Sequence, residues 1–142
     1  MASKMIEIAD AVKTLLTSQV TSAGGTITRP TDYVPRYDLP DLGSLVVTVV
    51  PRSQQRSREA RRISRRDNVI DVGILKRVPA GDADSLVEFA ENVATTLETT
   101  EIAVSGATFF GLEVALFEAE DMDERQLFLA VVSPTYRIGV TL

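Results

Sequence analysis

Apolar residues recur every three or four positions near the start of the chain. This spacing places them on one face of a helix, so the sequence predicts an amphipathic helix over Lys4–Gln19 that packs on a sheet. Ser3 is a common helix-capping residue, and Gly24-Gly25 ends the segment. The apolar positions are Met5, Ile8, Ala9, Val12, Leu15 and Leu16.

A second helical pattern follows a turn predicted at Pro79–Asp82. Ser85 and Glu88 have the spacing of a capping box, so we expect the helix to begin there. The threonine-rich segment 95–100 is expected to fray its end, and Glu101–Thr108 is expected to be a short connection. The buried stripe is predicted to comprise Leu86, Phe89, Ala90, Val93, Ala94 and Leu97.

Two apolar segments in the first half of the chain predict paired strands. Ser44–Pro51 has apolar residues on both faces, which is typical of a central strand covered on both sides. Asn68–Val78 alternates, so that Ile70, Val72 and Ile74 share one face. We expect these segments to form a hairpin.

The remaining segments are predicted to be extended or irregular. Three prolines in Thr26–Leu42 exclude a continuous central strand, so we expect an irregular edge strand followed by a loop. Leu112–Ala119 and Gln126–Val132 predict a second hairpin, and Thr135–Thr141 continues as an extended segment after Pro134. The order of helix, strands, helix and strands predicts a single α+β domain over residues 1–142, with a mostly antiparallel sheet and two packed helices.

Positive charge is concentrated between the first two strands. The segment 52–66 contains seven arginines and one acid, a formal charge of +6, whereas the whole chain carries −5. The rest of the chain therefore carries −11. We expect residues 52–67 to form a long Arg-rich arm that projects from the hairpin, mobile in the free protein and ordered in an assembly. Its arginines are Arg52, Arg56, Arg58, Arg61, Arg62, Arg65 and Arg66.

Composition restricts the chemistry available to this chain. It contains neither cysteine nor histidine, which excludes disulfides, thiolate zinc sites and histidine bases. Gly24-Gly25 and Gly106 lack the spacing of a phosphate-binding loop, and Ser105 lacks a nucleophile elbow. The acidic turn Glu120–Glu124 lacks EF-hand spacing, so a solvated tip is expected rather than a metal site. We expect no catalysis and no cofactor.

The arm itself permits three interpretations. It could be a solvated loop without a fixed partner. It could bind nucleic acid through phosphates, without base stacking because it has no aromatic residue. It could instead dock on an acidic protein surface, including a neighbouring copy, because guanidinium groups pair bidentately with carboxylates. No apolar run approaches the ~18 residues that a membrane span needs, so we expect a protein made in the cytoplasm without membrane contact.

Three segments resemble small structural proteins of tailed phages. They are Tyr37–Pro51 (YDLPDLGSLVVTVVP), Val69–Ile74 and Pro134–Ile138. The resemblance is to the tail terminator, or tail completion, proteins of long-tailed phages, and the order of predicted elements fits over most of the chain. Head–tail connectors and other neck or minor tail proteins are similar in size and remain the alternative.

The resemblance implies a structural virion protein rather than an enzyme. Such proteins form hexameric rings that cap the completed tail tube and face the head connector. Its expected partners are other copies of itself, the tail tube protein and the head–tail connector protein. The arm could then contact a neighbouring subunit, the tube or passing DNA. The alternative of a different class is a nucleic-acid-binding module that acts through the arm.

Overall fold

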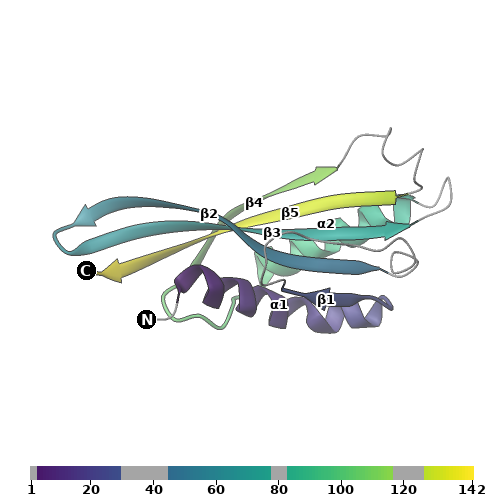
Figure 1. Ribbon diagram of the computed structural model, residues 1–142, viewed down its shortest axis with the longest axis horizontal. Helices are drawn as coiled ribbons and strands as arrows, with labels where there is room; N and C mark the ends of the chain where they lie inside the picture. Colours follow the sequence, from purple (N-terminus) through teal and green to yellow (C-terminus); the bar gives the residue numbers. More distant parts are fainter. Residues whose placement is uncertain (1–2, 30–44, 78–82, 117–126) are drawn as a thin grey trace.

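The computed structural model describes residues 3–29, 45–77, 83–116 and 127–142. They form a five-stranded mixed sheet and two helices, which confirms the predicted α+β class with a mostly antiparallel sheet. The elements in chain order are α1 (Lys4–Ser22), β1 (Thr26–Thr28), β2 (Val46–Ala60), β3 (Ile63–Arg77), α2 (Ala83–Thr99), β4 (Thr108–Leu116) and β5 (Leu127–Thr141) (Figure 1).

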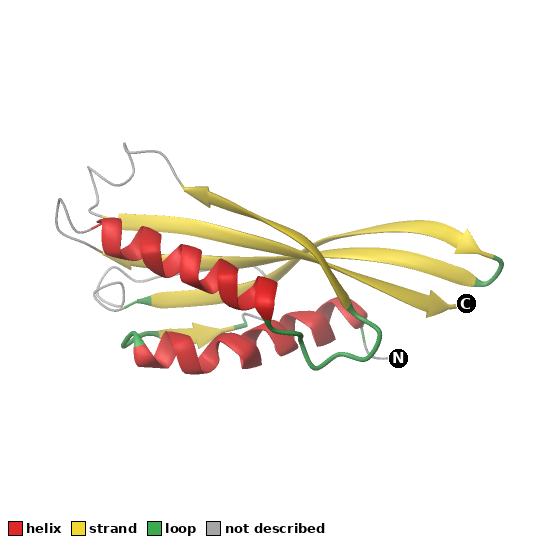
Figure 2. Ribbon diagram, turned by 180° about the vertical axis from the view of Figure 1, so that it is seen from behind, coloured by secondary structure: helices red, strands yellow, loops and turns green. Residues whose placement is uncertain are grey.

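Both helices pack on the same face of the sheet (Figure 2). The apolar stripe predicted for α1 is largely buried, and the predicted cap forms, because the backbone N–H of Ile6 donates to the Ser3 hydroxyl over 3.3 Å. The helix continues three residues past its predicted end because Val20 is also fully buried. Neither described helix is long and apolar enough to cross a membrane.

The sheet has the strand order β1-β2-β3-β5-β4. β1 runs parallel to β2, and the other three pairs are antiparallel. The predicted face of β3 is correct, because Ile70, Val72 and Ile74 are all fully buried in the core under the helices. In β2, Val47 and Val49 face the same core, and Thr48 on the opposite face is 6% exposed.

The predicted start and end of α2 are wrong. The helix begins at Ala83, so Ser85 lies inside its first turn rather than at the residue before it. It continues to Thr99 instead of fraying, and the hydroxyls of Thr95, Thr96 and Thr99 donate to carbonyls one turn earlier, over 2.8–3.0 Å. These bonds satisfy the hydroxyls without competing for backbone donors, so the threonines remain compatible with the helix.

The second predicted break, at Pro134, is also wrong. β5 passes through Pro134 as one 15-residue strand between β3 and β4. The ladder with β3 is interrupted there, between the pairs Val69↔Thr135 and Val72↔Val132, so β3 requires no backbone donor from the proline. β4 bulges on the other side between Phe109 and Gly111.

Some predictions fall on parts of the chain that the structure does not describe. They are most of the segment Thr26–Leu42, the turn Pro79–Asp82 and the acidic turn Glu120–Glu124. Of the first, only β1 (Thr26–Thr28) and Arg29 are described, and β1 lies at the edge of the sheet, as expected for this segment.

Candidate functional site: an arginine-rich β-ribbon

The basic segment forms two regular strands rather than a loop. β2 and β3 remain paired from Ser53↔Val69 to Ala60↔Ile63, and Arg61-Arg62 is a tight turn. β5 pairs with the other edge of β3 as far as Ile63↔Thr141. We call residues 53–69, with this backing from β5, the arginine ribbon. It extends past the ends of both helices (Figure 1).

The expectation of a loop-like arm over residues 52–67 is therefore corrected, whereas its mobility in the free protein stays a prediction. β3 has hydrogen-bonded neighbours on both sides, so its backbone groups are satisfied between two strands. β5 adds apolar side chains that anchor the ribbon, with Tyr136 and Ile138 only 1% and 3% exposed. The turn takes a left-handed conformation at Arg62, where φ is 69°, and the N–H of Leu142 donates to the Arg62 carbonyl over 2.7 Å.

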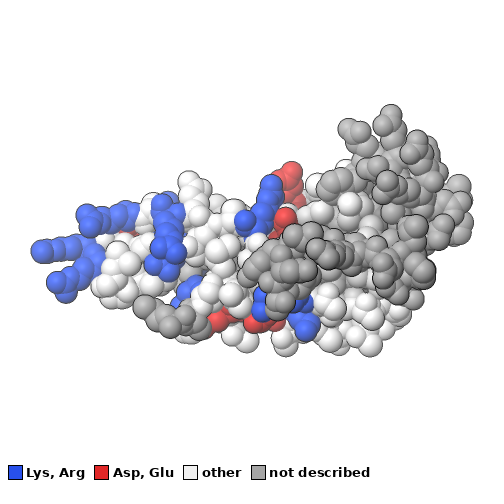
Figure 3. Space-filling model, viewed as in Figure 1, with Lys and Arg blue, Asp and Glu red and all other residues white. Residues whose placement is uncertain are grey.

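All seven predicted arginines lie in or immediately beside this ribbon, and five of them are exposed. Arg65 and Arg66 are half-buried because they belong to the middle strand, β3. Figure 3 shows the positive side chains gathered at the ribbon end of the molecule. The exposed arginines are Arg52, Arg56, Arg58, Arg61 and Arg62.

The arginines have few internal partners. Arg52, at a bulge in β2, lies 3.7 Å from Asp71, whose carboxylate also accepts from the Ser133 hydroxyl over 2.8 Å. Within the described residues, none of the other six lies within 4.0 Å of a carboxylate. The Nε atoms of Arg65 and Arg66 are buried and have no hydrogen-bond partner. The ribbon therefore carries positive charge that the described fold does not neutralise.

One arginine pair is directly unfavourable in the isolated protein. Arg56 and Arg66 are opposite each other in the β2–β3 ladder, so their side chains project from the same face. Like charges in this position destabilise a sheet. Arg56 turns its Nε toward Gln54, and Gln54 in turn donates to Asn68 over 2.7 Å. The ribbon tolerates this repulsion because β3 is also paired with β5, whose Tyr136 and Ile138 are buried.

A fork at the base of the ribbon joins β3 to β5. Arg137 donates to both oxygens of Asp67, over 2.8 and 3.2 Å, and its guanidinium lies 3.9 Å from the centre of the Phe110 ring. The hydrogen bond from Arg137 lowers the pKa of Asp67 and raises the pKa of Arg137. Buried Asn68 donates to the Tyr136 carbonyl over 3.3 Å and cross-links the same two strands.

Tyr136 is the largest fully buried side chain of this region. Its ring meets Phe109 edge-on, with 5.8 Å between the ring centres. Its hydroxyl has no hydrogen-bond partner, and burial raises its pKa to about 12. A phenol that ionises only near that pH is suited to packing rather than to proton transfer at neutral pH.

Several strand edges in the described part of the chain have no neighbour. β1 pairs only with Val46–Thr48, so the outer edge of the ribbon along β2 is unpaired. β4 is the opposite edge strand and leaves Val114 and Leu116 exposed at 38% and 53%. Such edges can accept a strand from another molecule.

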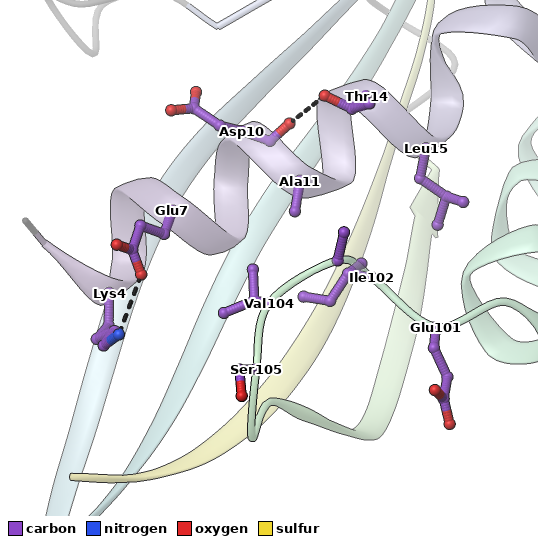
Figure 4. A pocket seen from close by; sticks show the side chains of 11 residues that line it. Lys4, Glu7, Asp10, Ala11, Thr14, Leu15, Glu101, Ile102, Val104 and Ser105 are labelled. Carbon is purple, nitrogen blue, oxygen red and sulfur yellow. Dashed lines mark hydrogen bonds and ion pairs between the residues drawn. The ribbon is translucent and has the colours of Figure 1, made fainter.

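A separate hollow of about 630 Å³ lies between the first half of α1 and the loop after α2 (Figure 4). Its carboxylates include Glu7, which pairs with Lys4 over 3.2 Å, and Asp10, which pairs with Arg29. Among the described residues, no group of three or more carboxylates is arranged to hold a metal ion. Glu7 and Asp10 are thus neutralised by neighbouring cations, whereas the ribbon carries unpaired charge and remains the stronger candidate.

Sequence reasoning did not find the acidic partners of the ribbon. Asp67 and Arg137 become neighbours only when β3 and β5 pair, and Asp71 comes close to Arg52 only when β2 and β3 pair. Comparison with protein-family models finds none that matches the chain, and a search of curated proteins finds no match.

Proposed function

We propose that this chain is a structural assembly protein of a phage tail, a tail terminator whose ring caps the tail tube and joins it to the head connector. In this function the chain contacts other copies of itself, the tube protein and the connector protein, and its place is the neck of the virion. It performs no catalytic step and requires no cofactor.

The observation that carries the proposal is the arginine ribbon. Six arginines without a carboxylate partner among the described residues lie on paired strands that reach beyond the helices. Positive charge held on a regular scaffold is suited to a defined partner surface. Because the remainder of the chain is strongly acidic, another copy of the same protein supplies a complementary surface.

Two further features support assembly. The described parts of the three segments that resemble tail terminators lie in β2, β3 and β5, which are adjacent in the sheet. The exposed apolar side chains of edge strand β4 also favour contact with a neighbour. The hexameric copy number follows from the resemblance alone.

The proposal is tested by deleting the gene from a phage that carries it and imaging the particles. Overlong or irregular tails without heads are expected, because tube growth has lost its stop. Tails of normal length beside emptied heads would assign the protein to the head side of the neck. Virions of normal appearance would refute a structural function.

A nucleic-acid-binding module is the second candidate, favoured by the exposed guanidinium groups of the ribbon. It predicts that log affinity for an oligonucleotide falls linearly with log salt, by about one unit for each phosphate contact. Replacing Arg61, Arg62, Arg65 and Arg66 with alanine would then abolish binding while the helical signal in circular dichroism persists. If these changes block assembly without altering oligonucleotide affinity, this candidate fails.

A further inference from the structure

The outer face of α2 carries a stripe of carboxylates that complements the arginine ribbon. Asp84, Glu88, Glu91 and Glu98 recur at intervals of three, four and seven residues, so they lie on one side of the helix, and all four are exposed. We call them the α2 stripe. α2 contains neither lysine nor arginine, so no cation on the same helix neutralises them.

The α2 stripe differs from the carboxylates of α1 in lacking partners. On α1, Glu7 pairs with Lys4 and Asp10 pairs with Arg29. Within the described part of the chain, no cation lies within 4.0 Å of any member of the α2 stripe. The fold therefore leaves two unneutralised surfaces of opposite sign.

Both surfaces oppose the stability of the free protein. Asp84 repels Glu88 one turn away, and Glu98 lies at the C-terminal end of α2, where the helix dipole disfavours negative charge. On the ribbon, Arg56 repels Arg66 across the ladder. Each conflict is relieved by opposite charge supplied from outside the chain, which indicates that the two surfaces are used in a complex.

The spacings of the two surfaces agree. Arg56 and Arg58 are two residues apart on β2, so they project from the same face and are about 6.6 Å apart along the strand. Carboxylates four residues apart on a helix are separated by about 6 Å along its axis. The α2 stripe spans about 21 Å, and the arginines from Arg56 to the turn residue Arg61 span roughly 17 Å, so several pairs can form together.

The two surfaces of one molecule cannot meet each other. The ribbon tip and α2 lie toward opposite ends of the sheet, and the turn of the ribbon projects away from α2 (Figure 2). Contact between them therefore requires two molecules. Because different surfaces meet, the contact is head-to-tail, and repetition of such a contact closes into a ring or continues as a filament.

We propose that the arginine ribbon of one copy docks along the α2 stripe of the next copy. This inference rests on the proposed assembly function and names the contact that builds the ring. Arg56, Arg58 and the turn arginines supply the positive side, and the carboxylates of α2 supply the negative side.

The first test is neutralisation of the stripe in Glu88→Gln/Glu91→Gln/Glu98→Gln, measured by sedimentation velocity over a concentration series. We expect the concentration needed for self-association to rise at least tenfold while the free protein melts at an equal or higher temperature. The control is Thr14→Lys/Thr17→Lys/Ser18→Lys, which makes the same change in net charge on the exposed face of α1 and should assemble like the wild type.

The second test is reciprocal charge reversal. Arg56→Glu/Arg58→Glu and Glu88→Arg/Glu91→Arg should each be monomeric, because each places like charges at the contact. Their mixture should assemble, since every contact in an alternating ring of even copy number is then attractive. Recovery of assembly in the mixture requires direct contact between the two surfaces, because a general effect of net charge would not restore assembly.

The outcomes separate this inference from the proposed function. If ribbon variants fail to assemble while stripe variants assemble normally, or if the mixture stays monomeric, the α2 contact is refuted and the assembly function stands. Wild-type protein that never self-associates also refutes the contact, and tail morphology after deletion still tests the function. Loss of oligonucleotide binding in the ribbon variants, with unchanged assembly, would identify nucleic acid as the partner.

Discussion

The repulsion between Arg56 and Arg66 predicts that a mutation on the ribbon stabilises the free protein, whereas mutation of an ordered residue usually destabilises it. The two residues are directly opposite in the β2–β3 ladder, and neither lies near a carboxylate among the described residues. Arg56→Glu replaces a like-charge pair with an attractive one. A directly opposite pair contributes about 0.2–1 kcal/mol in either direction, so reversing its sign should stabilise the free protein by about 1 kcal/mol.

The matched control for this change is Arg58→Glu. Arg58 is also exposed on β2, but its partner in the ladder is Ser64, which carries no charge. Both variants make the same change in net charge and the same change in strand propensity. Only the variant at position 56 gains an opposite charge across the ladder.

Thermal melting of dilute, monomeric protein measures the difference. For a chain of this length, about 1 kcal/mol corresponds to a melting temperature roughly 3–5 °C higher for Arg56→Glu than for Arg58→Glu. The gap should shrink in 1 M salt, where the Debye length is about 3 Å. Equal melting temperatures for the two variants at low salt would refute the reasoning.

Three further predictions concern the base of the ribbon and the connection between α1 and β1. Asp67→Asn removes the carboxylate that pairs with Arg137. Because the pKa of Asp67 in the folded protein lies below the usual 3.8, the ionised carboxylate stabilises the fold above pH 3.8, and this stabilisation is lost as the pH falls through the folded pKa. The stability gap to wild type in urea at pH 6 should therefore narrow at pH 3, and a constant gap would contradict this. Tyr136→Phe removes a buried hydroxyl that has no hydrogen-bond partner, so the free energy of unfolding should stay the same or rise by up to about 1 kcal/mol. A clear fall in the denaturant midpoint would show that the hydroxyl has a partner. Gly25→Ala would place a methyl group 2.8 Å from a backbone carbonyl oxygen and should cost about 1–3 kcal/mol, unlike Gly111→Ala, which meets no atom within 4 Å; equal melting temperatures for these two variants would refute the steric argument.

The apolar pattern predicted the parts of the fold that depend on local periodicity. The buried faces of α1, α2 and β3 follow from spacings of three, four and two residues, because burial of one face is what creates such patterns. The errors occurred where local signals compete with tertiary contacts. The threonines of α2 and Pro134 read as breaks, but hydroxyl back-bonding and a gap in the ladder accommodate them.

The sequence identified the arginines of the candidate site but not their setting. Seven arginines in 15 residues are visible in any reading of the chain, whereas the strand conformation of that segment is not, because arginine and serine contribute little periodic apolar signal. The α2 stripe was also present in the sequence, but its lack of partners emerges only when the cations of the fold are placed.

The sequence alone determined the class of fold, the core faces, the limited chemical repertoire and the separation of positive and negative charge. These properties depend on residue type and on spacing along one segment. Only the tertiary structure decided that the basic segment is a ribbon, because its order depends on pairing with β5, about 70 residues further along the chain. The same long-range pairing separates the ribbon from the α2 stripe, and this separation makes the proposed contact intermolecular.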